Sequence, residues 1–78
     1  MDEQFNLEFQ YLRYLSRVEL KESAMHPVQR QETKRAFMGA CAQMLVLMRE
    51  ELTKYSEDEA VDIIQAMWTQ AGEYWNKQ

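Results

Sequence analysis

The hydrophobic positions in the last third of the chain recur at the spacing of an amphipathic helix. Residues three, four or seven positions apart make up one apolar face: Ala60, Ile63, Ile64, Met67, Trp68, Ala71, Tyr74 and Trp75. Polar residues such as Asp62 and Thr69 lie on the opposite side, which is typical of a surface helix packed along one stripe. Ser56 and Glu59 stand just before this pattern with the spacing of a capping box. We therefore expect a helix over residues 57–76.

A second helix is predicted to begin at Pro27. Proline disfavours helical backbone for the residue before it and suits the first helical position itself. The apolar residues that follow on one side are Phe37, Cys41, Met44, Leu45, Met48, Leu52 and Tyr55. The pattern predicts a helix over residues 27–54, about 40 Å long. Gly39 lies inside it at a cost of about 1 kcal/mol relative to alanine. We therefore expect another helix to approach closely at Gly39. Because about 40 Å is longer than a compact bundle of this size needs, the helix should either overhang its neighbours or break near Gly39.

The first segment, residues 2–23, carries apolar residues over an unusually wide arc. One stripe holds Phe5, Phe9, Leu12 and Leu20, and a second stripe beside it holds Leu7, Tyr11, Tyr14, Leu15 and Val18. A helix with so wide an apolar arc must be covered from more than one side. Two neighbouring helices of the same chain would do this, and so would another molecule.

Together these patterns predict an all-α fold with three antiparallel helices in one domain, residues 1–78. The predicted helices span 2–23, 27–54 and 57–76, and connections of two or three residues place successive helices side by side in opposite directions. With 78 residues, two Gly and one Pro, the chain has too few turn residues for a β-sandwich or barrel. Dimerisation would cover the apolar surface that a core this small leaves exposed.

Catalytic and metal-binding signals are nearly absent from the sequence. A single Cys and a single His exclude a disulfide framework within one copy and a zinc site built from this chain alone. His26 is expected to flank the second helix, and Cys41 to be a small apolar side chain. We expect no enzyme activity, no catalytic residue, no cofactor and no metal. We expect the protein to be in the cytoplasm, because the chain begins with acidic residues and without the apolar stretch of a secretory signal. It also has no apolar run of about twenty residues that could span a membrane.

Basic residues crowd the start of the second helix, where they oppose the helix dipole: Arg30, Lys34 and Arg35. They could pair with glutamates of the first helix or with the acidic third helix. The alternative is a nucleic-acid surface that includes Arg13, Arg17 and Lys21. The net charge of −4 and the isoelectric point near 4.9 oppose that alternative, because nucleic-acid affinity rises with the phosphates neutralised.

Aromatic residues favour a protein partner instead. Four of them are the candidate partner-binding residues: Tyr11, Tyr14, Trp68 and Trp75. Trp and Tyr are enriched at the energetic centres of protein interfaces. Three amphipathic helices in so short a chain present more large apolar groups than one small core can cover.

The segment at residues 26–40, HPVQRQETKRAFMGA, resembles a stretch of small helical proteins of unassigned function encoded by tailed phages and prophages. The similarity lies in a Gln-Glu pair followed by Arg-Ala-Phe and then Gly. It implies a phage or mobile-element origin and a host or virion protein as partner. The expected function is that of a non-enzymatic interaction module, such as a phage accessory protein or a host-directed inhibitor. The alternatives are a nucleic-acid-binding protein and a small structural component of the virion.

Overall fold

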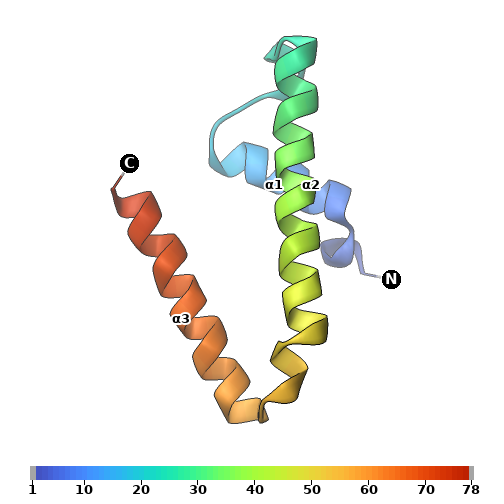
Figure 1. The fold of residues 1–78 in the computed structure, drawn as a ribbon. Helices are drawn as coiled ribbons and strands as arrows, with labels where there is room; N and C mark the ends of the chain where they lie inside the picture. The colour runs from blue at the N-terminus through green and yellow to red at the C-terminus, as the bar shows by residue number, and fades with distance from the viewer. Residues whose placement is uncertain (1, 78) are drawn as a thin grey trace. The chain divides into compact units, whose positions relative to one another are not determined.

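The computed structural model describes residues 2–77, and in this range the chain is all-α. The α-helices are α1 (Leu7–Arg17), α2 (Pro27–Glu50) and α3 (Glu57–Asn76), shown in Figure 1 in blue, cyan to yellow, and orange to red. Short 3-10 turns lie between them: η1 (Glu3–Phe5), η2 (Glu22–Ala24) and η3 (Leu52–Lys54). The all-α prediction with three helices is confirmed. The chain divides into two compact units, Met1–Met44 and Leu45–Gln78, and the division falls inside α2.

Helix α3 begins and ends where the sequence predicts. The Ser56 hydroxyl accepts a hydrogen bond from the backbone N–H of Glu59 at 3.2 Å, and the Glu59 carboxylate accepts one from the backbone N–H of Ser56 at 3.1 Å. This reciprocal pair is a complete capping box. The hydrogen bonds from Ser56 lower the pKa of Glu59 below its usual range, because they favour the charged carboxylate.

Replacing the cap residue tests this helix start. We expect Ser56→Ala to lower the free energy of unfolding by about 1 kcal/mol, because one backbone N–H of the first turn loses its acceptor. Urea denaturation followed by circular dichroism measures the loss. Ser23→Ala is the matched control, since Ser23 is exposed in η2, and its effect is expected to stay within about 0.5 kcal/mol. Equal effects of the two variants would contradict the capping role.

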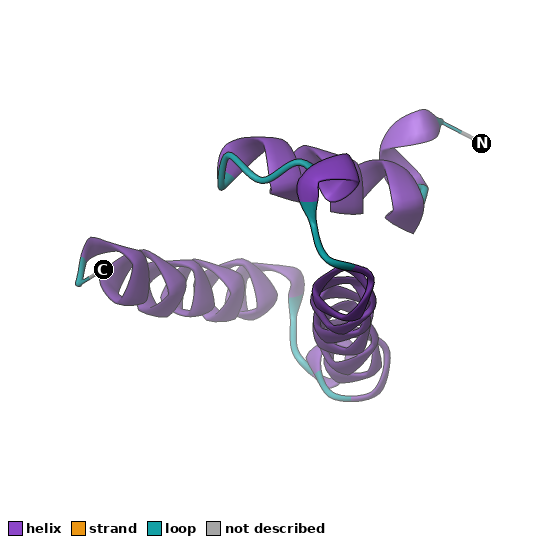
Figure 2. Cartoon of the chain, turned by 90° about the horizontal axis from the view of Figure 1, so that it is seen from above, coloured by secondary structure: helices purple, strands orange, loops and turns teal. Residues whose placement is uncertain are grey.

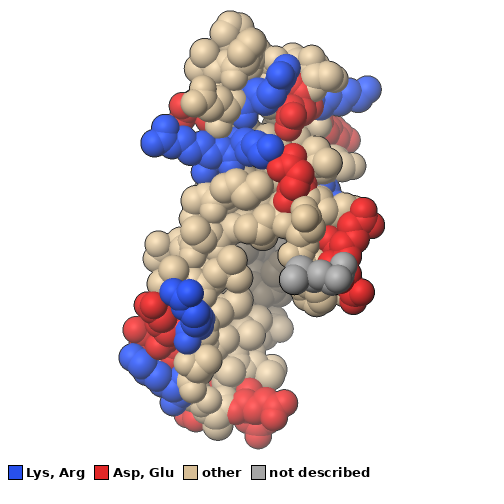
Figure 3. Space-filling model, turned by 90° about the vertical axis from the view of Figure 1, so that its right-hand side faces the viewer, with Lys and Arg blue, Asp and Glu red and all other residues tan. Residues whose placement is uncertain are grey.

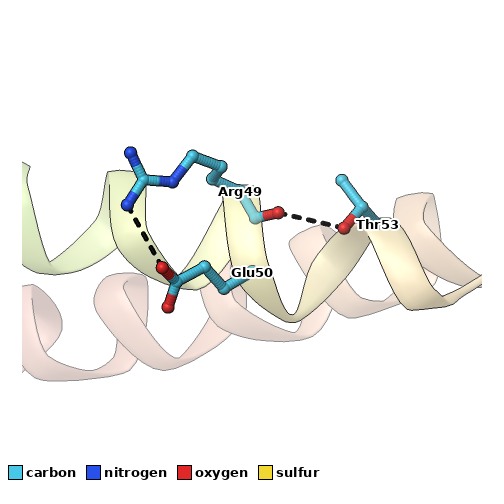
Figure 4. A network of polar contacts seen from close by, with 3 residues as sticks. All are labelled: Arg49, Glu50 and Thr53. Carbon is cyan, nitrogen blue, oxygen red and sulfur yellow. Dashed lines mark hydrogen bonds and ion pairs between the residues drawn. The ribbon is translucent and has the colours of Figure 1, made fainter.

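Helix α2 starts at Pro27 as predicted but ends four residues early. The His26 ring accepts a hydrogen bond from the backbone N–H of Val28 at 3.1 Å, so the histidine flanks the helix as expected. At the other end, the predicted boundary at residue 54 is wrong. The Thr53 hydroxyl donates to the carbonyl of Arg49 at 3.0 Å, and Arg49 also pairs with Glu50 (Figure 4). The last turn thus tightens into η3, as helix ends commonly do.

The close approach expected at Gly39 is not found. Helix α2 runs through Gly39 without a break. A Cβ atom built at this position would meet no atom within 4 Å. The glycine therefore has no packing role in the described part of the chain, and its cost to the helix is uncompensated there.

This observation gives a prediction of increased stability. We expect Gly39→Ala to raise the free energy of unfolding by about 0.5–1 kcal/mol, since alanine loses less backbone entropy in a helix and has room for its methyl group. Denaturant titration measures the gain. The reverse substitution at the next exposed position, Ala40→Gly, should lower stability by a similar amount. Destabilisation by Gly39→Ala would show that the position needs glycine after all.

The first helix is much shorter than the predicted 2–23. It starts after Asn6, whose side chain accepts from the backbone N–H of Phe9 at 3.0 Å. It ends before Glu19, which adopts the left-handed conformation with a φ of 59°. The backbone N–H groups of Glu19 and Leu20 donate to the carbonyls of Ser16 and Leu15, which is the Schellman pattern of a helix end. Glycine usually occupies the left-handed position, so a glutamate there gave no sequence signal.

A small aromatic core holds the first unit together. Its buried residues are Tyr11, Leu15 and Met25, and the half-buried Tyr14, Phe37 and Met38 pack against them. These side chains come from α1, from the connection after η2 and from α2. The connections between the helices, residues 18–26 and 51–56, are longer than the predicted two or three residues, because each includes a 3-10 turn. The parts of them that are not helical are teal in Figure 2. In the second unit, none of the described residues is fully buried.

Candidate functional site

The two candidate tyrosines lie in the core of the first unit. Tyr11 is fully buried, and its ring centroid is 5.4 Å from that of Phe37. Tyr14 is half-buried, and its ring centroid is also 5.4 Å from that of Phe37. Burial raises the pKa of the Tyr11 hydroxyl, and the nearby Glu22 carboxylate raises it further. Tyr11 therefore stabilises the chain itself and presents no surface to a partner.

The basic cluster at the start of α2 is largely engaged within the first unit. The Arg30 guanidinium donates to the backbone carbonyls of Glu22 at 3.2 Å and of Met25 at 3.4 Å, so it ties η2 to α2. Lys34 pairs with the Glu8 carboxylate at 2.8 Å. This hydrogen-bonded pair raises the pKa of Lys34. Pairing with a glutamate of the first helix was one of the two alternatives that the sequence offered for this cluster.

Only Arg35 of the three basic residues is exposed and has no hydrogen bond or ion pair among residues 2–77. On the face drawn in Figure 3, basic side chains (blue) lie next to acidic ones (red). Such mixing weakens the field that a phosphate backbone would meet. The cluster thus offers less to nucleic acid than its sequence suggests.

The apolar face of α3 divides into two parts. Ala60, Ile63 and Met67 are half-buried. They lie on the side of α3 that borders an apolar groove within the second unit. This groove has a volume of about 300 Å³, and every residue that lines it is apolar except Glu51. Its walls come from the end of α2, from η3 and from α3, and include Leu47, Met48, Leu52, Ile63, Ile64 and Met67.

The other part of this face is exposed and forms a continuous line, which we call the α3 stripe. It consists of Val61, Ile64, Trp68, Ala71 and Trp75. Trp68 is 69% exposed and Trp75 is 54% exposed, high values for the largest apolar side chain. The Tyr74 ring packs edge-on against Trp75, with 6.0 Å between centroids. The candidate residues Trp68 and Trp75 thus share one accessible surface, whereas Tyr11 and Tyr14 lie elsewhere.

Val61 is the member of the α3 stripe that was not part of the apolar face predicted from the sequence. The signal was present in the spacing, because residues 61, 64, 68, 71 and 75 are separated alternately by three and four positions. That is the repeat of a seam between two paired helices.

The first unit also leaves apolar side chains exposed. Of the two stripes predicted on the first helix, the one with Tyr11 and Leu15 forms the core. Large residues of the other stripe remain exposed, namely Phe5, Leu12 and Leu20. The wide apolar arc of this helix is therefore covered on one side only.

Within residues 2–77, acidic, His and Cys side chains nowhere gather in a group of three or more that could hold a metal ion. Cys41 is a free, half-buried thiol. None of the helices in this range is long and apolar enough to cross a membrane.

Comparison of the chain with models of known protein families, with curated proteins and with solved structures gives no match.

Proposed function

We propose that this protein is a non-enzymatic protein–protein interaction module that binds through the α3 stripe. The observation that carries the proposal is the exposure of Trp68 and Trp75 on one helix face. Exposed apolar surface that is contiguous rather than scattered is characteristic of interaction sites. Tryptophan is also one of the residues enriched among those that dominate binding energy.

The shortage of core in the second unit supports the same proposal. Its described residues include nine large apolar side chains that are exposed and none that is fully buried. Burial of apolar surface is the main favourable term in folding. A helical unit with so little internal burial gains stability when a partner covers its apolar face. Binding and folding are then linked through the same side chains.

The resemblance of residues 26–40 to phage-encoded proteins favours a host or virion protein as the partner class, and an accessory or inhibitory role. Such a role needs a binding surface and no reacting group, which suits a chain built almost wholly of helices. Nucleic-acid binding is the competing outcome, and it would depend on Arg35 together with Arg13 and Arg17.

A comparative pull-down tests the proposal. The tagged chain is used as bait in a bacterial lysate, beside the variants Trp68→Ala and Trp75→Ala. The matched controls are Gln70→Ala and Glu73→Ala, which shorten exposed polar side chains of the same helix. We expect protein capture that both tryptophan variants lose and both controls keep. Capture independent of the tryptophans, or release of bound nucleic acid by salt in its place, would contradict the proposal.

A further inference from the structure

The α3 stripe has the residue spacing of a helix-pairing seam, which an apolar patch of no particular pattern lacks. Its five residues follow the alternating three- and four-residue spacing over two heptads. Side chains at these positions line up along one side of an α-helix and interlock with an equivalent line on a second helix. The partner that matches such a seam is another helix with the same repeat. A second copy of this chain supplies one.

The exposed area of the α3 stripe suits a weak dimer. Its large members have exposed fractions of 59% for Val61, 45% for Ile64, 69% for Trp68 and 54% for Trp75. With about 200 Å² for a fully exposed large side chain, these residues present roughly 450 Å² per copy. Two copies together then bury about 900 Å², which is the size of a weak, reversible interface.

Charge favours the antiparallel orientation. The first two turns of α3 carry four acidic residues, Glu57, Asp58, Glu59 and Asp62, whereas the last two turns and the next residue carry one acidic residue and Lys77. Parallel pairing would set the two acidic clusters side by side. Antiparallel pairing sets each beside an end without net charge, so it avoids the repulsion between like charges.

Side-chain size selects the register. Trp68 and Trp75 are the bulkiest members of the stripe and Ala71 is the smallest. Setting Trp75 against Ala71 would leave Trp68 opposite position 78, beyond the end of α3 at Asn76, so Trp68 is the tryptophan that faces Ala71. An antiparallel pair that sets Trp68 of one copy against Ala71 of the other matches large to small, which close packing requires. The same register brings Trp75 of one copy beside Ile64 of the other. Since Ile64 also lines the apolar groove, Trp75 lies at a pocket of about 300 Å³ in the facing copy.

We propose that two copies of the chain associate through antiparallel α3 helices, with Trp68 packed on Ala71 and Trp75 beside Ile64 of the facing copy. This inference rests on the proposed function and adds a second copy of the chain as an occupant of the same surface, in competition with a host or virion protein. It makes the second unit a symmetric half-interface, in which each contact occurs twice.

The mass and the intrinsic fluorescence of the full chain test the association directly. Light scattering under reducing conditions, so that Cys41 cannot link copies, should give twice 9.4 kDa. The chain has two tryptophans, and both lie on the seam. Their emission should therefore shift to longer wavelength on dilution from about 1 mM to about 1 μM, as the dimer dissociates. A mass of 9.4 kDa with unchanged emission over this range would overturn the inference.

A pair of alanines on opposite sides of α3 provides matched variants. Ala71 and Ala66 are both exposed, and only Ala71 belongs to the seam. Ala71→Glu should weaken the dimer at least about 100-fold, because it sets an unpaired charge inside the interface. Ala66→Glu makes the same chemical change outside the interface and should leave the dimer constant within about threefold. Circular dichroism confirms that both variants keep their helices. Equal effects of the two variants would contradict the seam.

Cysteine cross-linking tests the orientation, in a Cys41→Ala background. In the antiparallel register, two Ala71→Cys positions lie about 5 Å apart along the helix axis, and two Val61→Cys positions about 25 Å apart. A disulfide needs Cα atoms within about 7 Å. We expect oxidation to link copies through position 71 much faster than through position 61. Equal rates would indicate parallel pairing and overturn this arrangement.

These outcomes separate the inference from the proposed function. A monomeric chain whose tryptophans still capture another protein would remove the self-association and leave the interaction module intact. A monomeric chain with no tryptophan-dependent capture would remove both.

Discussion

Replacing Tyr11 by alanine is expected to unfold the first unit. Tyr11 is the only described side chain with no exposed surface, and its ring joins α1 to α2 through the contact with Phe37. Truncation of a buried aromatic side chain costs about 3–5 kcal/mol, because it removes apolar burial and leaves a cavity. The core of this unit contains few other buried residues, so it cannot absorb such a loss. A marginally stable small domain has roughly this much stability in total.

Hydrogen exchange of backbone amides in α1 and in the first part of α2 measures the effect. Fluorescence would miss it, because both tryptophans lie in the second unit. Tyr11→Phe is the control. The Tyr11 hydroxyl is buried and has no hydrogen-bond partner among the described residues, so its removal should leave stability unchanged or raise it. Loss of amide protection in both variants would show that the Tyr11 hydroxyl, not the ring, stabilises the first unit.

Two helix starts were predictable from a polar or proline signal that acts locally, whereas the start of α1 was missed although Asn6 caps it. Pro27 and Ser56 fix the starts of α2 and α3, because their effect depends on the backbone of the next three residues alone. The end of α1 was not predictable in this way. Glu19 adopts the left-handed backbone at an unfavourable position for a residue with a Cβ, and two backbone hydrogen bonds offset that strain only in the folded chain.

The candidate site was half predictable for a different reason. Periodicity shows which residues share a helix face, but it does not show which face is covered. Packing decides that, and it covers Tyr11 of α1 whereas Trp68 of α3 is exposed. Tyrosine and tryptophan suit either environment. The choice between core and surface therefore depends on contacts between segments distant in sequence, such as that of Tyr11 with Phe37.

The basic cluster on α2 illustrates the same limit, because three similar side chains have three different environments. Arg30 hydrogen-bonds to carbonyls of the preceding connection, Lys34 pairs with Glu8, and Arg35 is exposed. In the sequence they form one patch. In the structure Arg30 links α2 to η2 and Lys34 links α2 to α1, whereas Arg35 makes no such contact among the described residues. The difference between Arg30 and Arg35 is measurable.

Arg30→Met is expected to lower the free energy of unfolding by about 2–3 kcal/mol, the second largest effect. Methionine keeps much of the aliphatic stem but cannot donate to the carbonyls of Glu22 and Met25, and hydrogen bonds from charged groups are worth about 1.5–3 kcal/mol each. The Met25 bond, at 3.4 Å, is the weaker of the two.

Arg35→Met is the matched control, since it removes the same charge five residues further along the same helix. Its side chain is exposed, so the change should stay within about 0.5 kcal/mol. Urea titrations of both variants, monitored by hydrogen exchange in the first unit, give the comparison. Similar losses would mean that net charge on α2, rather than the link to η2, determines stability. A loss specific to Arg30 would show that its hydrogen bonds to the carbonyls of Glu22 and Met25 hold the connection before α2 in place.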